Sequence, residues 1–331
     1  MKAILKTLWV VAMIIFMSQS WAAERVLRVT LQLPITNVLG QNVSAFKEIV
    51  ERESAGAIKV EIYPSAKLYK DKEVPQAVSS GAIEMGIAPV GRFATSKPAV
   101  ELFGLPFLFD NNEQVAVATT PGHPIRDTLD RELLETGTRV LWWQPFGLTV
   151  MLGRDQAPAN PSSLKGKKTR VFGKTMDKFV KDVGGTPVPL SGSQQFDAYK
   201  QGAVDFGMTG VTAVKSRKLY EVMGHLVNTN HTAIEFVVVI NDALWRDLSA
   251  AERSILSEAA VQVEKNLRVS YGQTHQRTLD WVAANTPMKV HDLSVEQRAA
   301  WREAAKPVYE WYIQQAGKTG ETLLAEARKL Q

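Results

Sequence analysis

The chain has 331 residues, no cysteine and a formal net charge of +5 at neutral pH. The lack of cysteine excludes disulfides, thiol nucleophiles and thiolate metal ligands. Lysine and arginine are spread along the sequence and do not form the basic runs that are typical of nucleic-acid binders, so we expect no nucleic-acid partner and favour a small anion.

Residues 1–22 are expected to be a secretory signal peptide. Lys2 and Lys6 give a positive start, residues 8–17 are continuously apolar, and Ser20 and Ala22 are the small residues of a cleavage site after Ala22. The apolar run is well short of the ~20 residues of a membrane-spanning helix, although an uncleaved anchor is an alternative. We therefore expect the mature chain in the periplasm, with a formal charge of 5 − 2 = +3 once the two lysines are removed.

Strand and helix patterns alternate through the first part of the mature chain. The patterns predict strands over 26–32, 58–63 and 83–88, with helices over 43–50 and 72–80 between them. Strands that alternate with helices in this way predict an α/β fold whose parallel sheets carry helices on both faces.

A second series of strands and helices begins near Gly147. The expected elements are extended segments over 138–143 and 149–152, a strand over 168–172, a helix over 176–183, a strand over 187–190, a helix capped by Ser193 that reaches Gln201, and strands over 204–209 and 234–240. A long helix from about Ser249 to Ala283 follows, begun by a capping box, and a last helix runs from about Ser294 to Gln315.

Two series of this kind predict two α/β lobes joined by more than one crossing strand. We expect lobe I to hold residues 23–147 and 236–275, and lobe II to hold residues 148–235 and 276–331. Small molecules bind between domains and at the carboxyl ends of strands in such folds, so the gap between the lobes is the expected ligand site.

The sequence offers little for catalysis. Residues 173–175 resemble the end of a phosphate-binding loop, but Lys168 stands where that motif needs glycine. The five histidines contain no pair three or four residues apart, so we expect no metal. Carboxylate pairs such as Asp127 and Asp130 lie at helical spacing among charged neighbours, which indicates a solvated face. We therefore expect no enzyme and no cofactor, and an exported enzyme is the least favoured alternative.

Several segments, taken in order, resemble the DctP family of TRAP-transporter solute-binding proteins. They are residues 59–68 (KVEIYPSAKL), 104–109 (GLPFLF), 163–171 (SLKGKKTRV), 201–205 (QGAVD), 219–222 (LYEV) and 229–231 (TNH), followed by Asn241 and Trp245. The resemblance implies two α/β lobes, a hinge and one long helix that crosses both lobes. It also implies a binding component that delivers an organic acid to the small and large subunits of a membrane permease, without ATP.

The resemblance further implies that Arg170 is the anchor for the ligand. A guanidinium offers two parallel N–H donors to a carboxylate and keeps its charge at every physiological pH, which suits this role. The alternative is an arginine at an exposed strand edge. Gln32 and His231 are secondary candidates for contact with the ligand, although a structural histidine is the more common case. For the oligomeric state, we take a monomer as the default.

Departures from the family pattern bear on the substrate. Thr149 stands where many members carry a second arginine, Phe172 replaces a proline and Pro89 replaces an acidic residue, while Thr209 or Gly210 replaces a frequent asparagine. Gly192 falls near the position of a frequent aromatic residue. The cavity would thus lose a charge, which favours a monocarboxylate with an apolar or aromatic remainder over a dicarboxylate or a sialic acid.

Two aromatic residues, Phe172 and Trp143, are expected to line such a cavity, with core packing as the alternative for each. A C4-dicarboxylate-binding protein and a periplasmic sensor accessory remain the alternative functions. The sensor would present the same liganded form to a receptor instead of a permease.

Overall fold

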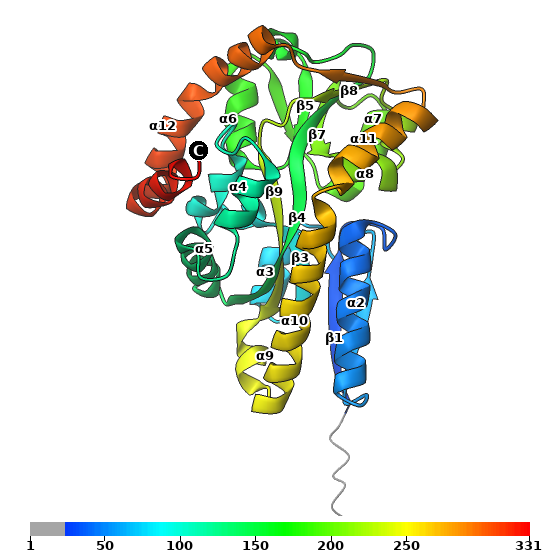
Figure 1. The fold of residues 1–331 in the computed structure, drawn as a ribbon, viewed down its shortest axis with the longest axis vertical. Helices are drawn as coiled ribbons and strands as arrows, with labels where there is room; N and C mark the ends of the chain where they lie inside the picture. The colour runs from blue at the N-terminus through cyan, green and yellow to red at the C-terminus, as the bar shows by residue number, and fades with distance from the viewer. Residues whose placement is uncertain (1–23) are drawn as a thin grey trace, which may run out of the picture.

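A computed structural model describes residues 24–331 of the chain (Figure 1). The expected signal peptide lies outside the described residues. Within residues 24–331, no helix combines the length and the apolar character that a membrane crossing requires.

Lobe I is built around three parallel strands in the order β2-β1-β3. Its first elements are β1 (Arg25–Leu31), α2 (Val38–Glu53), β2 (Ile58–Tyr63), α3 (Val74–Ser79) and β3 (Met85–Pro89). They are followed by short helical turns at Val90–Phe93 (η1) and Pro98–Gly104 (η2) and by α4 (Asn112–Ala118) and α5 (Pro124–Leu134). Leu27, Val29 and Leu31 of β1 are fully buried, whereas Val26 is exposed. The order of these elements confirms the predicted β-α-β order of this lobe.

Two strands pass from one lobe into the other. β4 (Thr138–Gly153) and β9 (Ala233–Asn241) are antiparallel neighbours at the centre of the sheet order β2-β1-β3-β9-β4-β7-β5-β6. Two extended segments were predicted over 138–152, but the structure has one continuous strand with a register shift between Pro145 and Leu148. Gly147 accommodates this irregularity with φ +78°, a conformation that glycine adopts without a steric penalty.

Lobe II is built around β7, β5 and β6. Its elements are a turn at Pro161–Leu164 (η3), β5 (Lys168–Val171), α6 (Lys174–Asp182), β6 (Thr186–Pro189), a turn at Gly192–Gln194 (η4), α7 (Gln195–Lys200), β7 (Phe206–Gly210), α8 (Val211–Ser216), a turn at Leu219–Glu221 (η5), β8 (His225–Asn228) and β10 (Lys289–Asp292). The predicted cap at Ser193 is wrong. Ser191 forms the capping box with Gln194, because the chain already turns at Gly192.

The long helix predicted over 249–283 is two helices. After α9 (Asp242–Asp247), α10 (Ala250–Tyr271) packs against α2 and β4, whereas α11 (Thr274–Asn285) packs against α8 of lobe II. The helical run therefore crosses both lobes, as expected, with an interruption at residues 272–273 (Figure 1). The capping box of Ser249 and Glu252 at its start is confirmed.

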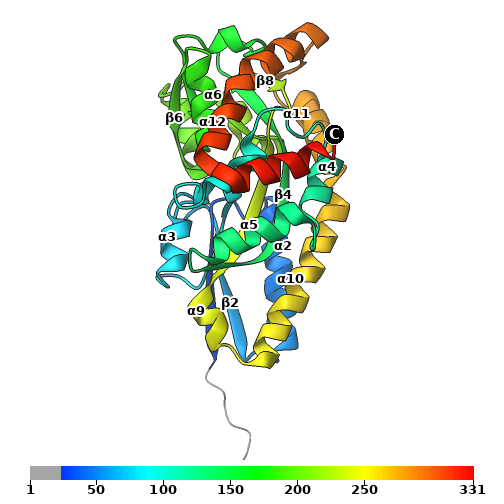
Figure 2. The same ribbon diagram turned by 90° about the vertical axis from the view of Figure 1, so that its left-hand side faces the viewer.

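The last helix, α12 (Val295–Arg328), extends beyond its predicted end. It changes direction at Gly317 (φ 57°), and Figure 2 shows its red end running across the long axis of the molecule. The helix packs against α6 of lobe II and against η2 of lobe I, where the hydroxyl of Tyr312 donates to the carbonyl of Ala99 at 2.9 Å. Because α12 contacts both lobes, its assignment to lobe II remains a prediction.

Candidate functional site

An interlobe cavity with about 240 Å³ of empty space lies at the carboxyl ends of β1, β3, β5 and β7 and beside the crossing strands β4 and β9. This is the edge of the sheet at which α/β proteins bind ligands. The cavity is lined by Gln32, Pro89, Phe146, Arg170, Phe172, Gly192, Gln195, Thr209, Gly210, Arg217, Ile234 and Phe236.

Arg170 enters the cavity from β5 and is 3% exposed. Its Nε and Nη2 donate to the carbonyl of Leu190 at 3.3 and 2.9 Å, and its Nη1 donates to the carbonyl of Met208 at 2.5 Å. The guanidinium also lies 4.9 Å from the centre of the Phe172 ring. Burial lowers the pKa of Arg170 to about 10, which leaves the side chain charged at neutral pH. These contacts hold the charge in one orientation.

Arg217, at the carboxyl end of α8, supplies a second guanidinium. Its Nη2 donates to Oε1 of Gln32 at 3.1 Å, which joins lobe II to lobe I at the cavity. The residue is half-buried, but its Nε is fully buried and has no partner among the described residues. Burial, and then the positive charge of Arg170, lower the pKa of Arg217 to about 9.

Neither guanidinium has a carboxylate partner among the residues that the structure describes. Within residues 24–331 the ion pairs leave out Arg170 and Arg217, and the nearby Asp71 is paired with Arg92 at 2.9 Å. Taking a charge out of water is costly unless an opposite charge compensates it. Two such cations at one cavity therefore make a site for an anion.

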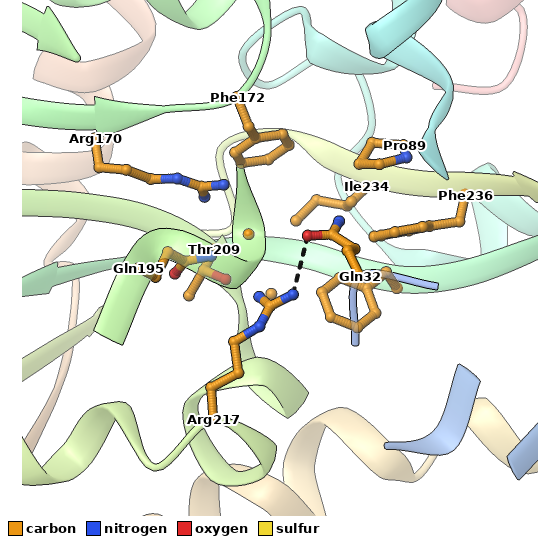
Figure 3. A pocket seen from close by; sticks show the side chains of 12 residues that line it. Gln32, Pro89, Arg170, Phe172, Gln195, Thr209, Arg217, Ile234 and Phe236 are labelled. Carbon is orange, nitrogen blue, oxygen red and sulfur yellow. Dashed lines mark hydrogen bonds between the residues drawn. The ribbon is translucent and has the colours of Figure 1, made fainter. Parts of the chain in front are cut away.

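The remaining walls divide the cavity into a polar side and an apolar side. In Figure 3 the tips of Arg170 and Arg217 converge near Thr209, with Gln195 on the same side. The opposite side carries Pro89, Phe146, Ile234 and Phe236, and the rings of Phe146 and Phe236 meet edge to face with 5.0 Å between their centres. An anionic headgroup with an apolar remainder would match both sides.

Contacts between the lobes surround the cavity. Glu101 of η2 accepts from the backbone N–H groups of Lys174 and Thr175 at 2.8 and 3.2 Å, so a carboxylate of lobe I caps the first turn of α6 in lobe II. On the other side, Nδ2 of Asn37 donates to the hydroxyl of Ser216 at 3.0 Å. The structure therefore has the two lobes in contact around the cavity.

Comparison with known proteins agrees with this architecture. Residues 32–315 match the model of the family DctP, described as bacterial extracellular solute-binding protein, family 7. The chain belongs to this family. Solute-binding proteins of the DctP family serve TRAP transporters and are not enzymes, and the chain is accordingly a periplasmic transport protein.

Curated and solved relatives extend over nearly the whole chain. A C4-dicarboxylate-binding periplasmic protein from Rhodobacter capsulatus is 26% identical over 86% of this chain and 85% of its own length. A TRAP solute-binding protein from Shewanella oneidensis with bound succinate has a TM-score of 0.88 at 22% identity, covering 93% of this chain and 99% of that chain. One from Ralstonia eutropha with bound (S)-2-acetolactate has a TM-score of 0.84 at 22% identity, covering 92% and 99%. These likenesses confirm the predicted fold.

The structure brings five of the predicted site residues of this DctP-family protein together at the cavity. They are Arg170, Phe172, Thr209, Gln32 and Pro89. Their contact with a ligand remains a prediction, but their common location agrees with it. The expectation that Arg170 faces the gap between the lobes, and not bulk water, is met.

The other three predicted residues lie away from the cavity lining. The indole N–H of Trp143 donates to Asp130 at 2.8 Å. This contact also corrects the expectation for Asp130, which does not belong to a fully solvated face. The hydroxyl of Thr149 lies 2.5 Å from that of Thr232, and Nδ1 of His231 lies 2.7 Å from the hydroxyl of Thr229. All three predicted residues are buried side chains that other parts of the protein hold in place.

Sequence reasoning missed Arg217, and this omission changes the electrostatics. The replacement of an expected arginine by Thr149 suggested that the cavity had lost a charge, but Arg217 provides one from a different element. In the sequence it lies between Lys215 and Lys218, so it is indistinguishable from a solvated basic run. Only its position after β7, near the ligand edge of the sheet, could have indicated its role.

Proposed function

We propose that this solute-binding protein captures a small monocarboxylate with an apolar remainder and delivers it to the small and large subunits of a TRAP permease. The observation that carries the proposal is a pair of guanidiniums, Arg170 and Arg217, at one cavity. Neither is ion-paired with a carboxylate in the described part of the chain. The ligand's carboxylate would supply the missing negative charge when the lobes close.

The shape and the walls of the cavity support a small ligand. About 240 Å³ of empty space, part of it open to solvent, lies among the lining residues. The apolar side would receive a short or branched hydrocarbon portion against Phe146, Ile234 and Phe236, where burial of apolar surface adds to affinity. The relative with bound (S)-2-acetolactate carries a small branched acid.

A C4-dicarboxylate is the second candidate, and Arg217 is the observation in its favour. A second guanidinium could neutralise a second carboxylate, and the Rhodobacter capsulatus relative is named for such ligands. The apolar side weighs against it, because a charged group buried there would lack a partner. A monocarboxylate therefore remains the preferred ligand.

A thermal-shift screen of carboxylic acids tests the ligand class, because a ligand that binds only the folded state raises the melting temperature. Branched and aromatic monocarboxylates should raise it, and titration calorimetry should then give their affinities. A screen in which dicarboxylates alone stabilise the protein would replace the first candidate with the second.

The partner is tested separately from the ligand. We expect genes for a small and a large permease subunit beside the gene for this protein, and uptake of the bound acid into proteoliposomes that contain those subunits. A neighbouring sensor-kinase gene, together with absence of uptake, would favour the sensor alternative. Analytical ultracentrifugation with and without acid checks the expected monomer.

A further inference from the structure

The hydrogen-bond donors of the two arginines are used very differently. A guanidinium has five N–H donors. In Arg170 three contacts to main-chain carbonyls leave 5 − 3 = 2 donors, one on each Nη atom. Two donors on adjacent Nη atoms match the two oxygens of a single carboxylate. Arg170 alone can therefore bind the carboxylate of the ligand.

Arg217 keeps more donors than a single carboxylate requires. Its one contact, to Gln32, leaves 5 − 1 = 4 donors, and one of these is on the buried Nε. Figure 3 shows Arg217 rising from α8 toward the tip of Arg170, so its Nη atoms lie on the side of the same headgroup region. Buried donors without acceptors are unfavourable, so a ligand that supplies another acceptor beside its carboxylate would be preferred.

Gln32 adds a further donor at this position. Its Oε1 accepts from Arg217, while its amide N–H₂ group has no partner among the described residues. This contact passes directly over Gly192, where a Cβ atom would lie 1.9 Å from Oε1 of Gln32 and 2.6 Å from Nη2 of Arg217. The absence of a side chain at Gly192 is therefore what allows lobe I and Arg217 to meet beside the headgroup.

We propose that Arg217 and Gln32 recognise an oxygen on the carbon next to the ligand's carboxylate, so that the preferred ligands are 2-oxo or 2-hydroxy acids. This inference rests on the proposed function, in which a monocarboxylate is held by Arg170. It adds that Arg217 sets the specificity and that its bond to Gln32 joins recognition of the headgroup to contact between the lobes.

A cycle that changes both the protein and the ligand tests the inference. The probes are 2-oxo-3-methylbutanoate and 3-methylbutanoate, which differ only at the second carbon, and the variants are Arg217→Met and Arg217→Lys. Calorimetry on the wild type should favour the oxo acid by at least about ten-fold, because an analogue that lacks the oxygen leaves buried donors unpaired. In Arg217→Met the preference should fall to less than about three-fold, since the donors are gone.

The control is Lys218→Met, which removes a positive charge from the next residue. Lys218 is exposed and does not line the cavity, so the oxo preference should persist. Arg217→Lys keeps the charge but loses the planar donor fork, so it should retain binding of both acids with a reduced preference. This variant also provides a folded protein with a conserved charge if the methionine variant is unstable.

The outcomes separate the inference from the function on which it rests. If the wild type binds both acids equally, or if Arg217→Met keeps the full preference, the inference falls and the proposed function stands. If neither acid binds the wild type, the monocarboxylate proposal and the inference fall together.

Discussion

Two groups of buried and half-buried arginines in this protein have opposite electrostatic surroundings. Beside the crossing strands, Arg126 pairs with Glu264 through two contacts of 2.5 and 3.0 Å, and Arg268 contacts Glu264 at 3.2 Å and Glu235 at 3.4 Å. At the interlobe cavity, the hydrogen bonds that Arg170 and Arg217 make within residues 24–331 go to carbonyl and amide oxygens.

The difference separates a structural cluster from a binding site. The first group connects α5, α10 and β9 with charges that compensate one another inside the protein, so it needs nothing from outside. The second group has two positive charges without an ion-pair partner among residues 24–331, and we propose that a ligand compensates them. The candidate site is therefore identified by arginines that lack a carboxylate partner, and not by the presence of arginine alone.

The largest expected effect comes from breaking the compensated group. Arg126→Ala leaves Glu264 short of its bidentate partner in a buried position, so the free energy of unfolding should fall by about 3–5 kcal/mol. Urea unfolding followed by circular dichroism measures it. A loss as small as that of an exposed arginine such as Arg302 would contradict the distinction between the two groups.

Removing the uncompensated charge should affect binding more than folding. Arg170→Ala should weaken binding of a carboxylate ligand by at least about 2 kcal/mol, since the buried carboxylate loses its partner. Titration calorimetry measures the loss, and urea unfolding without ligand should show a smaller change than Arg126→Ala. Unchanged affinity would rule out Arg170 as the anchor.

A smaller effect is expected at the contact between the lobes. Gly192→Ala places a Cβ where Gln32 and Arg217 meet, so we expect affinity to fall by about 1–2 kcal/mol, as is typical of overpacking. Gly272→Ala is the matched control, because a Cβ there has no atom within 4 Å. Equal affinities of the two variants for the ligand would show that the space over Gly192 is not needed.

The smallest effect concerns pH. Burial raises the pKa of Glu235 to about 7, against the opposing charge of Arg268, so the folded protein takes up a proton that the unfolded chain has lost. This contribution to stability is present below the unfolded pKa of about 4.5 and is lost as pH rises through about 7. Glu235→Gln should abolish it.

The measurement is the difference in unfolding free energy between wild type and Glu235→Gln at pH 5 and pH 8. Burial lowers the pKa of His231 to about 3, so the contribution of this histidine to stability is lost as pH falls below about 6.5. This dependence is opposite to that of Glu235. Because both proteins contain His231, the difference between them isolates the effect of Glu235. A difference that does not change with pH would mean that Glu235 stays charged throughout.

Much of the fold could be predicted from the sequence because its signals are local. The alternation of strand and helix patterns gave β1, β2, β3 and β5 within a few residues, and the capping box at Ser249 marked the start of α10. The single strand β4 was divided in the prediction because Pro145 and Gly147 are common in turns, and pairing with β9 overrides that tendency.

The candidate site was predicted only in part. Arg170 of β5 was found because it belongs to a continuous segment that resembles the family, and Phe172 follows that segment directly. Trp143 was expected at the cavity from its residue type, but its place on β4 directs it to Asp130 and Phe103 in the core. Strand position and pleat, not hydrophobicity, decide which aromatic side chain faces a ligand.

The sequence by itself determined the α/β class, the family and one arginine of the site, because periodicity, caps and contiguous segments are written along the chain. The tertiary structure alone decided that Arg217 of α8 meets Gln32 of β1's following loop over Gly192, a contact between residues 185 positions apart. Charges far apart in sequence become one anion site only when packing of the lobes removes the water between them.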